Sequence, residues 1–209
     1  MSWQLKYSMD DYKEETIKSY DKHAVEFSEK FKALLELERR KEFPDFLAAI
    51  PGKRVLDLGC GSGDHAAYFM EEGCDVTCVD LSEKMIDICK ERGLDAEVMD
   101  IENLRFDDDS FDGVWAVTSL LHVPKDKFTD VVSKLHRILA PGGILFVAVK
   151  DGDGEGMIND KNHPETKRFF SFWKKEELSV FFEDKFSLID YDKITLGTRV
   201  FLHFMFKKK

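Results

Sequence analysis

A glycine-rich turn holds the residues of this chain whose types and spacing best fit ligand chemistry. Residues 55–63 read Val-Leu-Asp-Leu-Gly-Cys-Gly-Ser-Gly, with Asp57 two positions before the first glycine. Alternate glycines let a chain turn sharply from a strand into a helix and leave room for a ligand against bare backbone. The spacing is G-x-G-x-G, whereas a dinucleotide site has G-x-G-x-x-G, and Asp64 stands where that third glycine would be. Two acids at the turn would repel a pyrophosphate and favour a cationic cofactor.

Two further acids end the apolar segments that follow this turn. Asp80 lies seventeen residues beyond Gly63, where a carboxylate accepts hydrogen bonds from both hydroxyls of a ribose in nucleotide sites of this topology. Asp100 ends the third segment and is placed to meet an adenine amino group. Each acid also has a plain structural interpretation: Asp57 as a cap of the turn, Asp80 as a helix-entry residue, Asp100 as a solvated strand end. S-Adenosylmethionine carries a sulfonium, an ammonium, a ribose and an adenine, and it fits the three acids together.

The segment 51–150 must position these acids, and in it short apolar stretches alternate with helical ones. Such alternation predicts a parallel sheet with helices on both faces. Almost continuous apolar stretches indicate strands that are buried on both sides. We therefore expect an α/β fold with a doubly wound, mostly parallel sheet. The expected strands are 54–58, 75–79, 96–99, 110–116 and 144–149, and the expected helices are 64–72, 83–92 and 124–139.

The two ends of the chain differ from this core. Apolar residues at helical spacing over 10–48 predict one or two helices that stop before Pro51. Three glycines and three acids in 151–156 predict a flexible loop, with a lid as the functional alternative. The helix expected over 174–182 has Ser171 as a possible N-cap.

Two apolar stretches near the C-terminus, 186–191 and 200–206, predict an antiparallel hairpin that finishes the sheet. A chain of 209 residues fits one core with modest additions. We expect a single domain over 1–209, made of an N-terminal helical cap at 1–50, a cofactor-binding core at 51–150, and a loop, helix and terminal hairpin at 151–209.

The charge balance weighs against nucleic acid as the main partner. The formal net charge is −10, and nucleic-acid binders usually carry a basic patch because phosphate neutralisation supplies much of their affinity. We interpret the basic clusters at 167–168 and 207–209 as solvated surface and a terminal tail. No secretory signal and no apolar run of membrane-spanning length is evident, so we expect a cytoplasmic protein without a membrane partner.

The four cysteines predict no metal site. Cys60, Cys74, Cys78 and Cys89 form no Cys-x-x-Cys pair, and no histidine stands at a zinc-ligand spacing from them. We interpret them as small thiols in a reducing compartment.

Taken together, the motifs resemble those of the class I S-adenosylmethionine-dependent methyltransferases, in that family's order and at its spacing. The likeness covers roughly residues 50–150, and each motif alone would be weak. Ser19-Tyr20-Asp21 is similar to a segment that often precedes this domain, and the residues after 150 have a looser likeness to general members of the family. The matching motifs are 55–63, 79–82, 99–101, 111–116, 120–124 and 139–143.

The resemblance implies a Rossmann-like sheet of seven strands with a reversed C-terminal hairpin, and S-adenosyl-L-methionine as the cofactor. It also implies roles for individual residues, with Tyr20 closing over the cofactor. The methionine part would be held by Asp57, Gly59, Cys60, Gly61 and Gly63, the ribose by Asp80, and the adenine by Leu81, Met85, Asp100 and Ile101, while Val117 and Leu121 would lie near the sulfonium.

His122 is the candidate catalytic residue. It follows the fourth expected strand, where acceptors approach in the family that the chain resembles, and a neutral imidazole takes a proton from a nucleophile at about pH 7. The alternative is that His122 orders the loop before Pro124. His65 and His163 are interpreted as surface or loop residues, and Trp115 as part of the core.

We expect S-adenosylmethionine-dependent methyl transfer to a small-molecule acceptor that the sequence does not identify. The cofactor is already activated, so the protein mainly positions the acceptor and excludes water, and a general base is optional. An RNA or protein methyltransferase is the alternative among enzymes, and a cofactor-binding regulator without transfer activity is the alternative outside them. The glycine spacing weighs against a nicotinamide oxidoreductase. Monomer and dimer both stay open.

Overall fold

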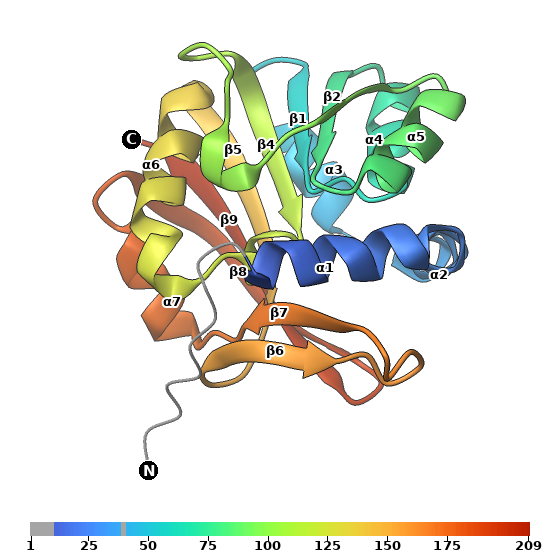
Figure 1. The fold of residues 1–209 in the computed structure, drawn as a ribbon. Helices are drawn as coiled ribbons and strands as arrows, with labels where there is room; N and C mark the ends of the chain where they lie inside the picture. Colours follow the sequence, from blue (N-terminus) through green and yellow to red (C-terminus); the bar gives the residue numbers. More distant parts are fainter. Residues whose placement is uncertain (1–10, 39–40) are drawn as a thin grey trace.

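A seven-stranded sheet forms the centre of the molecule (Figure 1). The computed structural model describes residues 11–38 and 41–209. The strands lie in the order β3-β2-β1-β4-β5-β9-β8, where β1 to β5 are parallel and β9 runs antiparallel to both of its neighbours. This confirms the predicted doubly wound sheet with a reversed C-terminal hairpin. The strands are β1 (Arg54–Leu58), β2 (Asp75–Asp80), β3 (Asp95–Val98), β4 (Phe111–Val117), β5 (Leu139–Lys150), β8 (Phe186–Leu196) and β9 (Arg199–Lys208).

Helices cover both faces of the sheet because successive side chains of each strand point to opposite sides. Val55 and Trp115 pack with α3 (Glu42–Ala49), α4 (Asp64–Glu71) and α5 (Glu83–Glu91). Leu56 and Val114, one position away, pack with α6 (Phe128–Ile138) and α7 (Lys175–Phe182). Both clusters are almost wholly buried, which explains the continuous apolar stretches of the sequence.

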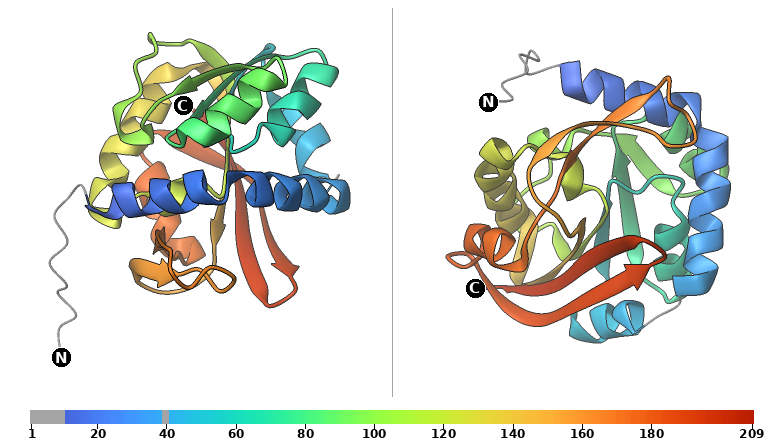
Figure 2. Two further views of the ribbon diagram at one scale, coloured as in Figure 1. Left: turned by 45° about the vertical axis from the view of Figure 1, so that its right-hand side comes forward. Right: turned by 90° about the horizontal axis from the view of Figure 1, so that it is seen from below.

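Two N-terminal helices lie across the carboxyl ends of the parallel strands (Figure 2). They are α1 (Asp11–Lys22) and α2 (Ala24–Glu38), and with α3 they make three helices where the sequence predicted one or two. Ala24 and Phe27 of α2 bury their side chains against Met85 of α5, which fixes the helices to the core. Within the described ranges, we find no helix whose length and apolar character would suffice for a membrane crossing.

A second sheet, formed by β6 (Glu155–Asn159) and β7 (Lys167–Ser171), corrects the prediction for the C-terminal part. The two strands pair antiparallel, so residues 151–156 are partly strand and not only a loop. Ser171 belongs to β7, where its hydroxyl donates to the Val123 carbonyl at 2.6 Å, and it does not cap α7, which follows Lys174. The hairpin lies beside α1 (Figure 1). Phe169 N–H of β7 donates to the Thr16 hydroxyl of α1 at 3.0 Å.

The helix predicted over 124–139 is shorter than expected. A 3-10 turn, η3 (Lys125–Lys127), precedes α6, and β5 already begins at Leu139. The Pro-Gly-Gly turn at 141–143 therefore lies within the first part of β5, where Leu139 pairs with Phe111 before the register shifts.

Candidate active site

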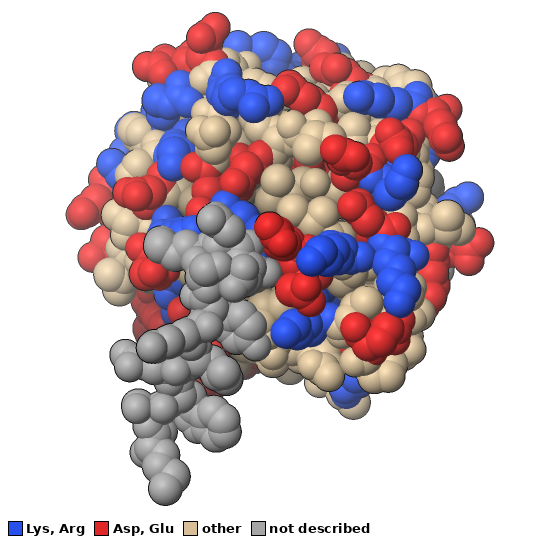
Figure 3. Space-filling model, in the orientation of Figure 1, with Lys and Arg blue, Asp and Glu red and all other residues tan. Residues whose placement is uncertain are grey.

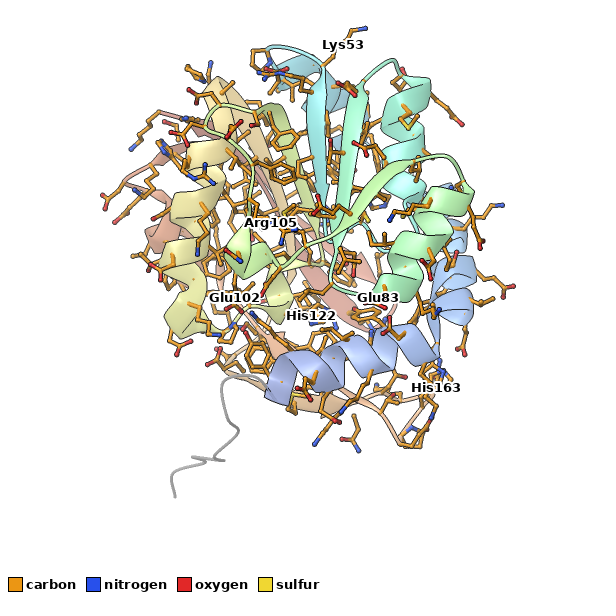
Figure 4. The ribbon with its side chains drawn as sticks, turned by 45° about the horizontal axis from the view of Figure 1, so that its top comes forward. Lys53, Glu83, Glu102, Arg105, His122 and His163 are labelled. Atoms are coloured by element: carbon orange, nitrogen blue, oxygen red, sulfur yellow. The ribbon has the colours of Figure 1, made fainter. Side chains whose placement is uncertain are left out.

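A cavity of about 290 Å³ opens at the carboxyl ends of the parallel strands. Seen from below, α1, α2, the β6–β7 hairpin and the β8–β9 hairpin frame this edge (Figure 2, right). His122 lies there, between the strands and α1, whereas Lys53 lies at the opposite end of the sheet (Figure 4). The strand order reverses between β1 and β4, and open α/β sheets bind ligands outside the strand ends at such a point. The volume lies just below the roughly 300–1,000 Å³ typical of small-molecule sites.

The glycine turn after β1 forms one wall of this cavity. Gly59, Gly61 and Gly63 all adopt left-handed φ angles, of 73°, 53° and 76°. Gly59 N–H and Cys60 N–H both donate to the Val79 carbonyl, at 2.8 and 3.0 Å, which ties the turn to the end of β2. A Cβ atom at Gly59 would lie 2.3 Å from Cβ of Ser119, so the close packing of the turn on the segment after β4 requires glycine.

Asp57 presents a buried carboxylate without a full set of partners. The residue is 3% exposed, and its Oδ2 atom has no hydrogen-bond partner among the described residues. Burial, and after it the nearby Cys89 and Asp80, raise the pKa of Asp57 well above its usual range. Burying an incompletely bonded carboxylate is costly, so a ligand group with positive charge or N–H donors would relieve the cost.

Asp80 is held in place by the backbone of two turns. Its Oδ2 accepts from Gly61 N–H at 3.0 Å, and its Oδ1 accepts from Ser82 N–H at 2.8 Å. Burial raises the pKa of Asp80 to about 6, although these backbone hydrogen bonds act in the opposite direction. Each carboxylate oxygen keeps a second lone pair, so the fixed side chain can still accept hydrogen bonds from a ligand.

Asp100 lines the same cavity, but its charge is already compensated. Its Oδ2 lies 2.6 Å from Nζ of Lys13, and its Oδ1 accepts from Glu102 N–H at 2.8 Å. Glu102 binds Lys13 at 3.0 Å and Lys127 at 2.9 Å, and it also accepts from the Tyr12 hydroxyl. These contacts fix α1 to the segment after β3, a role that the sequence did not indicate for Asp100.

Asp64 does not add free charge to the turn, contrary to the sequence interpretation. Its carboxylate lies 2.9 Å from Nη1 of Arg92 and accepts from the Ser62 hydroxyl at 2.7 Å. The acidic character of this end of the cavity therefore rests on Asp57 and Asp80.

His122 forms a hydrogen-bonded pair with Tyr20. Nδ1 of His122 lies 2.6 Å from the Phe169 carbonyl, which can only accept, so Nδ1 carries the proton. Nε2 then accepts from the Tyr20 hydroxyl, 2.9 Å away. Burial lowers the pKa of His122 to about 3, which keeps the imidazole neutral. The catalytic candidate thus lies in the cavity with both ring nitrogens occupied.

The structure brings all but two of the predicted site residues to the cavity wall. Met85 faces away and packs against Ala24 and Phe27, because the buried face of α5 turns it toward α2. Gly63 faces Leu94 and Cys89 behind the turn. The residues that do line the cavity are Tyr20, Asp57, Gly59, Cys60, Gly61, Asp80, Leu81, Asp100, Ile101, Val117, Leu121 and His122.

Sequence reasoning missed several residues of the wall. His65, interpreted as a surface or loop residue, is on α4 and accepts from Nε1 of Trp115 at 3.0 Å, and burial lowers its pKa to about 4. Thr118 has a φ of 54°, rare for a non-glycine residue, and Ser119 has a buried hydroxyl without a partner among the described residues. The one sequence signal for Thr118 and Ser119 as wall residues is their position directly after the predicted fourth strand.

Besides Lys13, four cations line the cavity: Lys30 of α2, Lys150 of β5, Arg168 of β7 and Arg199 of β9. Arg168 was interpreted as solvated surface, but its side chain is only 14% exposed. The sequence separates these residues by up to 169 positions, so only the folded chain shows that they meet.

A group of metal-ligand types outside the cavity is not organised for metal binding. Among the described residues, His23, His163 and Glu165 have ligand atoms within 4.8 Å of one another. His163 lies at the hairpin end of the molecule (Figure 4). The two imidazoles stack 3.6 Å apart at 19°, so their lone pairs run nearly parallel and do not converge on one point.

Comparison with known proteins shows which domain the core resembles. Residues 55–143 match a protein family described as a methyltransferase domain. The chain is 36% identical over 115 residues to the malonyl-[acyl-carrier protein] O-methyltransferase of Enterobacter lignolyticus, a match that covers 53% of this chain and 45% of that protein. The chain spans about half the length, or less, of the curated relatives it matches.

Solved structures share the fold. A SAM-dependent methyltransferase from Methanosarcina mazei superposes with a TM-score of 0.70 at 19% identity, covering 78% of this chain and 96% of that one. The 1,6-didemethyltoxoflavin-N1-methyltransferase of Burkholderia thailandensis, solved with 1,6-didemethyltoxoflavin and S-adenosylhomocysteine, superposes with a TM-score of 0.74 at 18% identity, covering 100% of this chain and 93% of that one. The second match extends the likeness to the terminal segments that frame the cavity.

Proposed function

We propose that the protein belongs to the class I S-adenosylmethionine-dependent methyltransferases, binds S-adenosylmethionine in its cavity and transfers the methyl group to a small-molecule acceptor. The match of residues 55–143 to a methyltransferase domain supports this proposal. The observation that carries the proposal is the buried Asp57 carboxylate with an unpartnered oxygen, beside a left-handed glycine turn at the end of β1.

The residues present fit this cofactor. Asp57 and the turn at Gly59 and Gly61 would hold its methionine part, because an ammonium group supplies the donors that the Asp57 carboxylate lacks. Asp80 would accept from the ribose hydroxyls. Apolar contacts to the rest of the cofactor would come from Leu81, Ile101, Val117 and Leu121. When bound, S-adenosylmethionine supplies an already activated methyl group.

We assign Gly63 and Met85 supporting positions in this site. Gly63 makes the turn with its left-handed φ, and Met85 fixes α2 against α5. Asp100 orients α1 through Lys13, and its remaining lone pairs stay available to an adenine amino group.

His122 acts in this proposal as a positioning residue for Tyr20. Its Nε2 lone pair accepts the Tyr20 hydroxyl proton, and its pKa of about 3 makes it a weak base. The protein's contribution to transfer is then to orient the acceptor and exclude water beneath α1 and the β6–β7 hairpin. An acceptor that arrives deprotonated, or with a free amine lone pair, needs no base.

A small-molecule acceptor is favoured over RNA or protein. The cavity is small and framed by helices and hairpins on several sides. Acidic and basic side chains are interspersed over the face drawn in Figure 3, and the net charge of −10 gives no general attraction for phosphate backbones.

Thermal unfolding with S-adenosylmethionine, S-adenosylhomocysteine and NAD in parallel tests the proposal. At about a hundred times the dissociation constant, a bound ligand raises the melting temperature of a chain of this size by roughly 5–10 °C. We expect this shift with the first two ligands and none with NAD. A shift with NAD alone would refute the proposal. Release of S-adenosylhomocysteine in the presence of an acceptor then separates an enzyme from a regulator.

A further inference from the structure

The charged side chains of the cavity form two groups, one mainly acidic and one mainly cationic. Asp57, Asp80 and Asp100 come from the ends of β1, β2 and the segment after β3, where the acids Asp64 and Glu102 are paired with Arg92, Lys13 and Lys127. Across β4, Lys150 ends β5 and Arg199 begins the adjacent β9 at the same edge, and Glu42 of α3 also lines the cavity there, beside His203. Lys30 of α2 and Arg168 of β7 complete the cationic group. The acidic side suits a cationic cofactor, and the cationic side needs a different occupant.

The cationic group has too few carboxylates to neutralise it. Arg168 binds Asp160, yet its Nε atom is buried and has no hydrogen-bond partner in the described part of the chain. No ion pair to a carboxylate is formed by Lys30, Lys150 or Arg199 within residues 11–38 and 41–209. The other nearby acids are Glu26, which faces His163, and Glu42, which faces His203.

The cations lower the tendency of the two lysines among them to hold a proton. Burial, and after it the charges of Arg168, Arg199 and Lys30, lower the pKa of Lys150 to about 7. Burial, Arg199 and Arg168 likewise lower the pKa of Lys30. Like charges in a partly enclosed site raise the free energy of the ligand-free protein, and an anion removes that cost.

Aromatic rings line the same part of the cavity. Nζ of Lys150 lies 3.6 Å from the ring centroid of Phe170, and the Arg168 guanidinium lies 4.8 Å from Phe27 and 5.1 Å from Tyr20. These contacts hold the cationic heads at the cavity wall. They also provide an apolar surface for the body of an organic ligand.

We propose that the methyl acceptor is a small organic anion whose carboxylate or phosphate group is bound by Lys150, Arg168 and Arg199. This inference rests on the proposed function, since it concerns the acceptor half of the same cavity. In the proposed cofactor site, Asp57 and the glycine turn would hold the methionine part, on the opposite side of β4 from Lys150 and Arg199. An anionic acceptor bound at the cationic side would therefore not compete with the cofactor for its site.

Inorganic phosphate is the first probe, added to protein saturated with S-adenosylhomocysteine and compared with sodium chloride at equal ionic strength. At about ten times its dissociation constant, phosphate should raise the melting temperature of the wild type by roughly 3–6 °C. Arg199→Gln and Lys150→Met should abolish the shift. Arg105→Gln, which removes an exposed arginine from outside the cavity, should preserve it. Arg199 is itself exposed, so its variant is expected to fold.

A methylation screen with paired compounds then tests the acceptor class and separates carboxylate from phosphate. Each carboxylic acid or phosphate monoester is compared with its neutral amide or alcohol, and the released S-adenosylhomocysteine is measured. We expect turnover with the anionic member, at least tenfold less with its neutral partner, and a KM for the anion raised about tenfold by Arg199→Gln with an unchanged KM for S-adenosylmethionine.

Two outcomes overturn the inference in distinguishable ways. If S-adenosylhomocysteine itself does not bind, the proposed function fails, and the inference falls with it. If it binds, but phosphate stabilises the wild type and the two cavity variants equally, or neutral partners are methylated as well as the anions, the anionic-acceptor inference alone is wrong.

Discussion

The hydroxyl of Tyr20, on α1, donates to Nε2 of His122, on η2 (Leu120–His122), across 2.9 Å. This bond joins the N-terminal helices to the segment after β4, two parts of the chain that frame the cavity. Because Nδ1 of His122 is bound to the Phe169 carbonyl, the same imidazole also reaches β7. One side chain thus fixes three segments around the proposed acceptor position.

Tyr20→Phe should show the value of this bond. The substitution leaves Nε2 of His122 buried without a donor, so we expect the free energy of unfolding to fall by about 1–2 kcal/mol. We expect kcat to fall about tenfold, because α1 then positions the acceptor less well. Tyr191→Phe, which removes a hydroxyl outside the cavity, is the control. A pH–rate profile with an ionisation near pH 6.5 that disappears in His122→Asn would instead identify His122 as a free general base.

Gly59→Ala should prevent formation of the cofactor site. A Cβ there meets Cβ of Ser119 at 2.3 Å, and the left-handed φ of 73° adds about 1–2 kcal/mol. Gly93→Ala is a matched control, since Gly93 has a φ of 78° but open space where the Cβ would lie. Denaturant unfolding should show that Gly93→Ala lowers the free energy of unfolding only by the conformational cost of the left-handed φ. Gly59→Ala should lower it by several kcal/mol, because the contact with Ser119 adds to that cost. Equal losses would mean that the contact with Ser119 is unimportant.

Asp80 predicts a pH dependence of stability. Its pKa is about 6 in the folded chain and about 3.9 when unfolded, so folding favours the neutral acid. Ionisation of Asp80 therefore lowers the free energy of unfolding. This loss is absent below about pH 4, grows as the pH rises, and reaches about 3 kcal/mol above about pH 6. The free energy of unfolding of the cofactor-free protein should therefore decline between pH 4 and pH 8, and it should decline less in Asp80→Asn. The same decline in the variant would assign it to other groups, Asp57 among them.

Lys150 predicts a pH dependence of acceptor binding. Its pKa of about 7 in the free protein means that the ammonium is lost above that pH, while a bound anion raises the pKa and favours the charged form. The dissociation constant for an anion of constant charge should thus be lowest below about pH 7 and rise above it. Arg168, Arg199, Lys30 and Asp160 also act on this lysine, and the first two stay charged throughout. Phosphate gains negative charge over the same pH range, which acts in the opposite direction, so sulfate, whose charge is constant there, is the control. A sulfate dissociation constant that does not rise above about pH 7 would contradict the role of Lys150.

Much of the fold could be predicted because its signals are local. The glycine turn and the acids at strand ends fall within a few residues of apolar stretches, and the sheet follows from their alternation with helices. The β6–β7 hairpin was missed because residues 151–156 combine glycines and acids, which are typical of loops. Strand β7, which pairs with β6, begins only at Lys167 and is not evident from the residues around β6.

The cationic half of the site could not be predicted for a different reason. Lys30, Lys150, Arg168 and Arg199 come from four elements far apart in the chain, and each has the sequence context of an ordinary surface residue. The packing of Met85 against Ala24 and Phe27 could not be predicted either, because the resemblance that assigned Met85 to the adenine covers residues 50–150 and says nothing of the helix that packs on it.

Calorimetric titration of S-adenosylmethionine into the wild type, Asp57→Asn and Asp75→Asn tests the central claim most directly. Asp57→Asn removes the buried charge, so we expect about ten- to a hundredfold weaker binding together with a higher melting temperature of the cofactor-free protein. Asp75→Asn, at the exposed start of β2, should bind like the wild type. Undetectable binding to the wild type, or equal affinity in all three proteins, would contradict the proposed cofactor site.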